Sequence, residues 1–260
     1  MNDTSMVEID PHAYVEGNAL PLTLLPGTLC DARMFDPLLD CLNLTERVTV
    51  RGSYDGARSV DEAVACLLET IPPRTILFGF SLGGIVALAL ARAAPDRIAA
   101  MVLSNSTARP IDAAMHGDRR DEVERARADG MIDHVQALLP RYLLDPSARH
   151  HAELILSMAS ASVDRFADQT ELALSRTDAR PWLQTLGMPV LVIGGGQDGI
   201  NPPAVQIEMA DALPASTLVL IERSGHFTPL EQPEVVASHV ATWLGQVDAM
   251  NISTIKERQR

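Results

Sequence analysis

Apolar and polar positions along the chain follow two alternating patterns. Short runs of aliphatic and β-branched residues are separated by longer stretches in which apolar residues recur every three or four positions. The short runs are typical of buried strands, and the longer stretches are typical of amphipathic helices. Strands are predicted at Leu20–Leu25, Arg47–Val50, Thr75–Phe78, Ile98–Leu103, Val190–Ile193 and Thr217–Ile221. This alternation predicts an α/β protein with a mostly parallel central sheet, covered by helices on both faces.

Helices are predicted between several of these strands. The stretch Val60–Thr70 follows Ser59, a residue type that commonly caps a helix N-terminus. The stretch Leu82–Ala94 is rich in Ala and Leu, which favour helices. A last helix is predicted at about Pro233–Leu244, because proline is favoured at the first helical position.

One interval, from about Ala108 to Thr185, breaks the alternation because it contains no convincing strand. Helical patterns occur in it at Asp118–Asp129, His134–Leu144, Ala152–Ser160 and Phe166–Ser175. The first of these is dense in charged residues, whereas the others carry apolar residues at helical spacing. We therefore predict a helical lid, residues 108–185, inserted between two late strands of a core formed by residues 1–107 and 186–247. Residues 248–260 are predicted to form a polar, frayed tail.

The charge balance narrows the choice of partners. The chain of 260 residues has a formal net charge of −13, which argues against binding to nucleic acid or to an anionic membrane surface. The first twenty residues have no basic start and no apolar core, so we predict no secretory signal and a cytoplasmic location. Cys30, Cys41 and Cys66 form no close-spaced metal motif and are expected to be free thiols.

The most specific local motif surrounds Ser81. Gly79 and Gly83 flank it in the G-x-S-x-G pattern, with the strand Thr75–Phe78 before it and a predicted helix after it. This strand–turn–helix context is the one a nucleophile elbow requires, because the tight turn leaves the serine hydroxyl exposed. The alternative is a glycine-rich turn in which Ser81 only caps the helix. We predict Ser81 as a nucleophile.

A serine nucleophile needs a base, and the base needs an acid to orient it. Among the seven histidines, His226 lies directly after the last predicted strand, where sites form in parallel sheets. Asp198 lies just after the strand Val190–Ile193 and gives the chain order nucleophile, acid, histidine. The loop Ser104–Thr107, another place for the acid, holds no carboxylate. The alternatives are a structural loop histidine and an aspartate that only stabilises a turn.

Two backbone amides are predicted to hold a developing oxyanion. Leu82 begins the helix after the nucleophile, and Thr28 lies in the loop after the first strand. Leu29 is the neighbour that could replace Thr28, since Pro26 has no N–H. Cys30 lies nearby, but it lacks a basic partner in sequence and is predicted to be a packed thiol.

Taken together, Pro26-Gly27, the Gly79–Gly84 elbow, the loop 195–198 and Gly225-His226 resemble the α/β-hydrolase superfamily over roughly residues 20–245. Within this superfamily the chain is similar to small capped esterases of the pimeloyl-carrier-protein methyl ester esterase group. The resemblance implies Ser81 as nucleophile, Asp198 as acid, His226 as base and a lid over the pocket. Many relatives have His-Gly where this chain has Pro26-Gly27.

The resemblance and the motifs favour hydrolysis of an ester-like acyl bond in an ester, thioester or lactone of a small to medium, largely apolar substrate. Two alternatives stay open, which are carbon–carbon bond hydrolysis with the same triad and a non-hydrolytic ligand-binding protein on this fold. A mostly apolar pocket is expected, with Leu138, Leu139, Met158 and Phe166 as candidate wall residues. No cofactor and no metal are expected, and the sequence predicts no oligomeric state.

Overall fold

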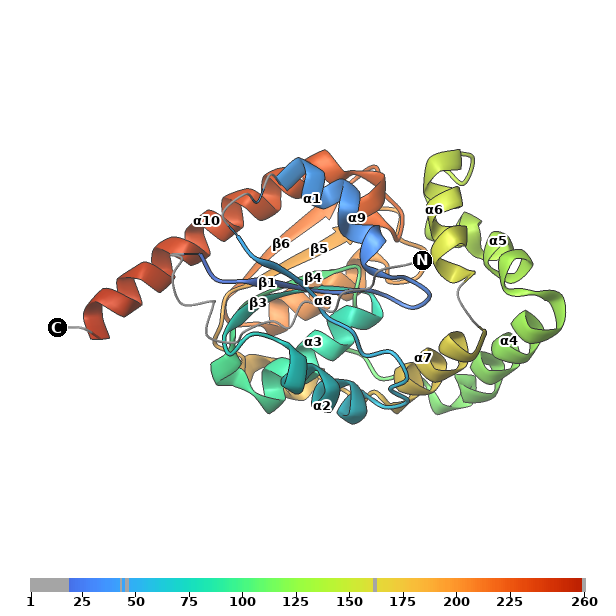
Figure 1. Ribbon diagram of the computed structural model, residues 1–260, viewed down its shortest axis with the longest axis horizontal. Helices are drawn as coiled ribbons and strands as arrows, with labels where there is room; N and C mark the ends of the chain where they lie inside the picture. Colours follow the sequence, from blue (N-terminus) through green and yellow to red (C-terminus); the bar gives the residue numbers. More distant parts are fainter. Residues whose placement is uncertain (1–18, 43, 45–46, 161–162, 259–260) are drawn as a thin grey trace, which may run out of the picture.

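The computed structural model describes residues 19–42, 44, 47–160 and 163–258, and a six-stranded parallel sheet lies at its centre (Figure 1). Across the sheet the strands are β2 (Thr49–Arg51), β1 (Leu22–Leu25), β3 (Thr75–Phe80), β4 (Ile98–Ser104), β5 (Val190–Gly195) and β6 (Ser216–Ile221). All six predicted strands are present, with boundaries shifted by at most two residues. The first 18 residues, where we predict no secretory signal, lie outside the described residues.

Alternating side chains of the strands build two apolar layers, one on each face of the sheet. Phe78 of β3 belongs to the layer that includes α1 (Asp36–Leu42) and α10 (Pro233–Arg258). Its neighbour Leu77 belongs to the opposite layer, where the helices are α2 (Val60–Thr70), α3 (Leu82–Ala93) and α8 (Pro203–Ala212). This division follows from the two-residue period of a strand. The predicted α/β architecture with helices on both faces is confirmed (Figure 1).

The strand order reverses between β1 and β3. The chain passes from β1 outward to β2 and then returns across β1 to β3, after which the strands are added in the other direction. Leu25 at the end of β1 pairs with Gly79 of β3, so the loops that follow these two strands leave the sheet side by side. Such a switch point is where open parallel sheets form their ligand sites.

Among the described residues, four α-helices lie between β4 and β5, in the interval where helical patterns are predicted. They are α4 (His116–Asp129), α5 (Met131–Tyr142), α6 (Arg149–Ala159) and α7 (Val163–Ser175). They lie together at one end of the sheet (Figure 1). Hydrogen bonds connect them to loops that follow strands: Leu29 donates to Gln169, and His226 donates to the Tyr142 carbonyl. The helical segment therefore adjoins the carboxyl edge of the sheet, where the strands end.

The prediction of a frayed tail from residue 248 is wrong for most of that segment. Helix α10 continues without a break to Arg258. Asp248 forms an ion pair with Arg47 at 2.5 Å, and Asn251 accepts a hydrogen bond from Arg74 at 2.9 Å. No proline interrupts the sequence after Pro233, so the helix can continue while these contacts hold it against the sheet.

Candidate active site

Ser81 occupies the sharp turn between β3 and α3. Its backbone has φ 50° and ψ −113°, a conformation that is costly for a residue with a side chain. The turn is tight because the backbone of Gly79 approaches that of Gly83: a Cβ added to Gly79 would lie 2.5 Å from the Gly83 carbonyl oxygen. The predicted elbow geometry is thus present, with strand, left-handed serine and helix in succession.

His226 lies beside this serine, in the loop that follows β6. Its Nε2 is 3.1 Å from the Ser81 Oγ. The ring packs among aromatic side chains, with centroids 5.3 Å from Phe80 and 5.9 Å from Phe227. The backbone N–H of His226 donates to the Tyr142 carbonyl at 2.7 Å. Packing and hydrogen bonding therefore fix both the position and the tilt of the imidazole.

Asp198 completes the series from the loop after β5. Its two carboxylate oxygens lie 3.0 and 2.9 Å from the His226 Nδ1, and only 3% of the residue is exposed. Burial by itself raises the pKa of this carboxyl, but the hydrogen bond and charge of His226, with donors from Asn105 and Asn201, outweigh burial. The net result is a pKa below the usual range, so Asp198 is ionised at neutral pH.

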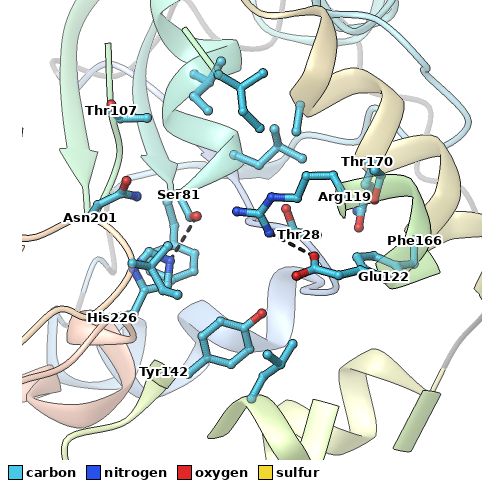
Figure 2. A pocket seen from close by; sticks show the side chains of 18 of the residues that line it. Thr28, Ser81, Thr107, Arg119, Glu122, Tyr142, Phe166, Thr170, Asn201 and His226 are labelled. Carbon is cyan, nitrogen blue, oxygen red and sulfur yellow. Dashed lines mark hydrogen bonds and ion pairs between the residues drawn. The ribbon is translucent and has the colours of Figure 1, made fainter. Parts of the chain in front are cut away.

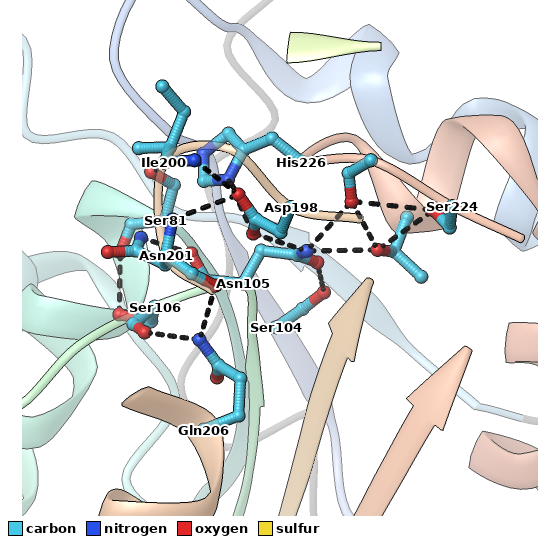
Figure 3. Close-up of polar contacts among 12 residues, drawn as sticks. Ser81, Ser104, Asn105, Ser106, Asp198, Ile200, Asn201, Gln206, Ser224 and His226 are labelled. Carbon is cyan, nitrogen blue, oxygen red and sulfur yellow. Dashed lines mark hydrogen bonds and ion pairs between the residues drawn. The ribbon is translucent and has the colours of Figure 1, made fainter. Parts of the chain in front are cut away.

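The donors around Asp198 form a network that the sequence analysis missed (Figure 3). Asn105 Nδ2 donates to Asp198 Oδ2 at 3.0 Å, and the Ser104 hydroxyl donates to Asn105 Oδ1 at 2.8 Å. The backbone amides of Ile200 and Asn201 donate to Asp198 Oδ1 at 2.8 and 2.9 Å. In the sequence these residues belong to the polar run Ser104–Thr107, which follows β4 and holds no carboxylate.

We expect Asn105→Asp to lower kcat/KM about tenfold or more, because a donor to a charged group is replaced by a second carboxylate. Steady-state kinetics measure the loss. Asn251→Asp on α10 makes the same substitution far from the site and is the control; equal values of kcat/KM for the two variants would contradict the expectation.

Glu231 joins the histidine loop to the helical segment. Its carboxylate accepts hydrogen bonds from the backbone N–H of Gly225 at 2.9 Å and from that of Leu144 at 2.8 Å. Burial raises the pKa of this carboxyl, although these backbone donors counteract the rise. The segment after α5 and the loop that carries His226 are therefore held together by one side chain. No sequence signal identified this residue, because its closest partners are backbone N–H groups.

The two predicted oxyanion donors lie on either side of the switch point. Leu82 is the first residue of α3, where the helix itself offers its amide no acceptor. Thr28 lies in the turn after β1 and faces the same cavity as Ser81. Leu29, the alternative to Thr28, has its amide bound to the Gln169 side chain at 2.8 Å and a φ of 59°. This contact favours Thr28 over Leu29 as the free donor.

A cavity of about 220 Å³ lies in front of Ser81 (Figure 2). It is lined by Thr28, Phe80, Ser81, Leu82, Ile85, Thr107, Ile111, Arg119, Glu122, Leu138, Arg141, Tyr142, Phe166, Gln169, Thr170, Ala173, Leu174, Arg176, Ile200, Asn201, His226 and Phe227. The expectation of a mostly apolar lining is wrong, since three arginines and a glutamate are among these residues. Of the four candidate wall residues, Leu138 and Phe166 line the cavity. Leu139 and Met158 do not line it and pack in the apolar core.

The cysteines take no part in the hydrogen-bonded series of Ser81, His226 and Asp198. All three are free, and Cys30 is buried with a pKa raised to about 12 by desolvation. A thiol in that state is a poor nucleophile, in agreement with the prediction that it is packed.

Within the described residues no cluster of His, Cys, Asp and Glu has the arrangement of a metal site. No described helix is long and apolar enough to cross a bilayer.

A parallel sheet that brings a serine, a histidine and an aspartate into hydrogen-bonded series at its carboxyl edge is the arrangement of a broad class of α/β hydrolytic enzymes. Residues 37–233 match the model of the alpha/beta hydrolase fold, and the chain therefore belongs to the α/β-hydrolase family.

Individual relatives narrow this class. The chain is 30% identical to a pimeloyl-[acyl-carrier protein] methyl ester esterase of Neisseria meningitidis, covering 83% of this chain and 90% of the relative. It is 29% identical to 3-oxoadipate enol-lactonase 2 of Acinetobacter baylyi over 66% and 64% of the two chains. A thermophilic esterase from Thermogutta terrifontis superimposes with a TM-score of 0.77 at 29% identity, covering 89% and 92%. The chain is thus a hydrolase that resembles carboxylic ester hydrolases of this family.

Proposed function

We propose that this protein hydrolyses an ester or lactone through an acyl-enzyme on Ser81. The observation that carries the proposal is the continuous series of hydrogen bonds from the Ser81 hydroxyl through His226 to Asp198, with 3.1 Å and 2.9 Å between the heavy atoms. A serine hydroxyl in contact with an oriented imidazole is activated for attack on an acyl carbon. The names of the relatives, a methyl ester esterase and an enol-lactonase, support this substrate class.

In the first half-reaction the Ser81 Oγ attacks the acyl carbon, and His226 Nε2 takes the hydroxyl proton. The carbonyl oxygen becomes an oxyanion, held by the backbone N–H groups of Leu82 and Thr28. The C–O bond of the ester then breaks, and the leaving alcohol takes the proton from His226. Asp198, ionised and bound to Nδ1, stabilises the imidazolium that exists between these two proton transfers.

In the second half-reaction a water molecule replaces the alcohol. His226 removes one proton from the water, and the water oxygen attacks the carbonyl carbon of the acyl-enzyme. The same two backbone N–H groups hold the oxyanion that forms. Collapse of this intermediate releases the acid and returns the proton to the Ser81 Oγ. The chain's own groups thus complete the cycle, and a lactone differs only in that the alcohol stays attached to the acid.

We further propose that residues 108–185 act as a cap on a core made of residues 1–107 and 186–247. Helices α4, α5 and α7 supply cavity residues, among them Arg119, Tyr142 and Phe166 (Figure 2). Enclosing the ester limits the access of bulk water and strengthens polar interactions at the reacting atoms. The cap therefore determines which acyl or alcohol groups fit beside Ser81.

Treatment with a fluorophosphonate, followed by intact-protein mass spectrometry, tests the activated serine. We expect one adduct on the wild-type protein and none on Ser81→Ala, because only Ser81 contacts a base that the described site orients. Ser238→Ala removes an exposed hydroxyl from α10 and is the matched control, which should still form the adduct.

The absence of an adduct on folded wild-type protein would contradict the proposal and favour a non-hydrolytic ligand-binding protein. A panel of acyl esters, thioesters and lactones then defines the bond that is cleaved. An adduct without turnover of any of these substrates would favour carbon–carbon bond hydrolysis by the same side chains.

A further inference from the structure

The cavity in front of Ser81 differs in charge from the rest of the molecule. The chain carries a formal net charge of −13, yet the cavity is lined by Arg119, Arg141 and Arg176 against a single carboxylate, Glu122. An acidic protein that collects an excess of arginines in one enclosed site concentrates positive potential there. Hydrolysis of a neutral, apolar ester gives no reason for these charges.

Arg176 lies directly after α7 and pairs with no carboxylate among the described residues. Its Nε donates to the Arg109 carbonyl at 3.1 Å, and one terminal nitrogen donates to the Ala173 carbonyl at 3.3 Å. Burial and, to a smaller extent, the charge of Arg119 lower the pKa of Arg176 to about 10. A guanidinium that is partly buried, held by carbonyls and near a like charge lacks an anion.

Arg119 reaches the same cavity from α4. Figure 2 shows its side chain extending into the space that Ser81 faces, with a dashed contact to Glu122. The guanidinium lies 3.0 Å from the Glu122 carboxylate, one turn further along the helix. This pair orients Arg119 while leaving the other edge of its planar fork available. Glu122 offsets one positive charge, so two of the three arginine charges that line the cavity stay uncompensated by a lining carboxylate.

From this arrangement we infer that Arg119 and Arg176 bind a carboxylate of the substrate, so that the preferred substrate is an ester carrying a free carboxylate, such as the half-ester of a dicarboxylic acid. The inference rests on the proposed function, since it places the ester at Ser81 and the carboxylate at the arginines. Guanidinium groups match the planar geometry of a carboxylate and bind it by paired, charge-assisted hydrogen bonds. The bound anion would also relieve the repulsion between the two arginines.

Two esters of equal length test the inference: the 4-nitrophenyl half-ester of adipic acid and 4-nitrophenyl hexanoate, which differ by a carboxylate in place of a methyl group. We expect kcat/KM of the wild-type protein to favour the half-ester by about tenfold or more at low salt. Arg176→Gln and Arg119→Gln should each lower this ratio about tenfold. Arg149→Gln removes the same charge from the exposed surface of α6 and should keep the wild-type ratio.

A wild-type ratio of one or less would overturn the inference, as would a loss of preference in Arg149→Gln equal to that in Arg176→Gln. If the hexanoate ester is still hydrolysed and Ser81 still forms its adduct, the hydrolase proposal stands and only the carboxylate site fails.

Binding without turnover separates the two proposals further. Calorimetry on Ser81→Ala should show monomethyl adipate binding about tenfold more tightly than dimethyl adipate, with the difference lost in Ser81→Ala/Arg176→Gln. Equal affinities would overturn the carboxylate site whether or not the wild-type protein is an esterase.

Discussion

Replacing His226 with alanine is expected to lower kcat of ester hydrolysis by about 10⁴-fold or more, because the Ser81 hydroxyl then loses the base that we propose for it. The imidazole lies 3.1 Å from that hydroxyl. Steady-state kinetics on the hydrolysed ester measure the loss. His239→Ala on the exposed face of α10 is the control and should leave kcat within about twofold of the wild type.

The partners of His226 should behave as one unit. Asp198→Asn, which keeps the shape of the side chain but removes its charge, should lower kcat by about 10³- to 10⁴-fold. The double variant His226→Ala/Asp198→Asn should be little worse than His226→Ala, because Asp198 acts only through the imidazole. If the fold losses of kcat in the two single variants multiplied in the double variant, Asp198 would contribute to catalysis independently of His226, which would contradict the role proposed for it.

The strands and the elbow could be predicted because their signals are local. A buried parallel strand such as β5 (Val190–Gly195) needs a continuous apolar run, and this run is visible in the sequence. The position of His226 could be predicted for a related reason: residues directly after parallel strands meet at one edge of the sheet. Chain order then selected Asp198. These inferences needed only the spacing of residues and the topology of a parallel sheet.

Residues whose partners are distant in sequence could not be predicted in this way. Asn105 and Asp198 are 93 residues apart, and Glu231 is 87 residues from Leu144. No local pattern distinguishes such residues from ordinary polar residues. The extension of α10 to Arg258 depends likewise on contacts between residues that are distant in sequence. Arg47 and Asp248 are 201 residues apart, and Arg74 and Asn251 are 177 residues apart.

The charge of the cavity was missed because it depends on the orientation of helices. Asp118–Asp129 was interpreted only as a charged surface helix, and most of its charges do lie on the surface. Arg119, however, lines the cavity. A pattern that is polar all round a helix gives no indication of which charged residue faces inward. The packing of α4 against its neighbours decides this, and it is set by tertiary structure.

Gly83→Ala is expected to destabilise the protein by more than about 3 kcal/mol, the largest stability change that we predict for a single added methyl group. A Cβ at this position would overlap the carbonyl oxygen of Leu25 and lie 2.7 Å from that of Pro26. Both obstacles are backbone atoms, one at the end of β1 and one in the loop that also carries Thr28, so relief would require α3 to move away from them. Urea denaturation followed by circular dichroism measures the change.

Gly245→Ala provides the opposite case on α10. No atom of the described residues lies within 4 Å of a Cβ added there, and the residue is exposed in a helix, so alanine should stabilise the protein by about 0.5–1 kcal/mol. The midpoint of urea unfolding of Gly83→Ala distinguishes two cases. If it equalled that of the wild-type protein, the first helical turn after Ser81 would accommodate the methyl group without strain. The oxyanion position between Leu82 and Thr28 would then be adjustable and not fixed by the fold. A large loss confined to Gly83→Ala would instead mean that the close contact of α3 with the β1 loop holds these two amides in place.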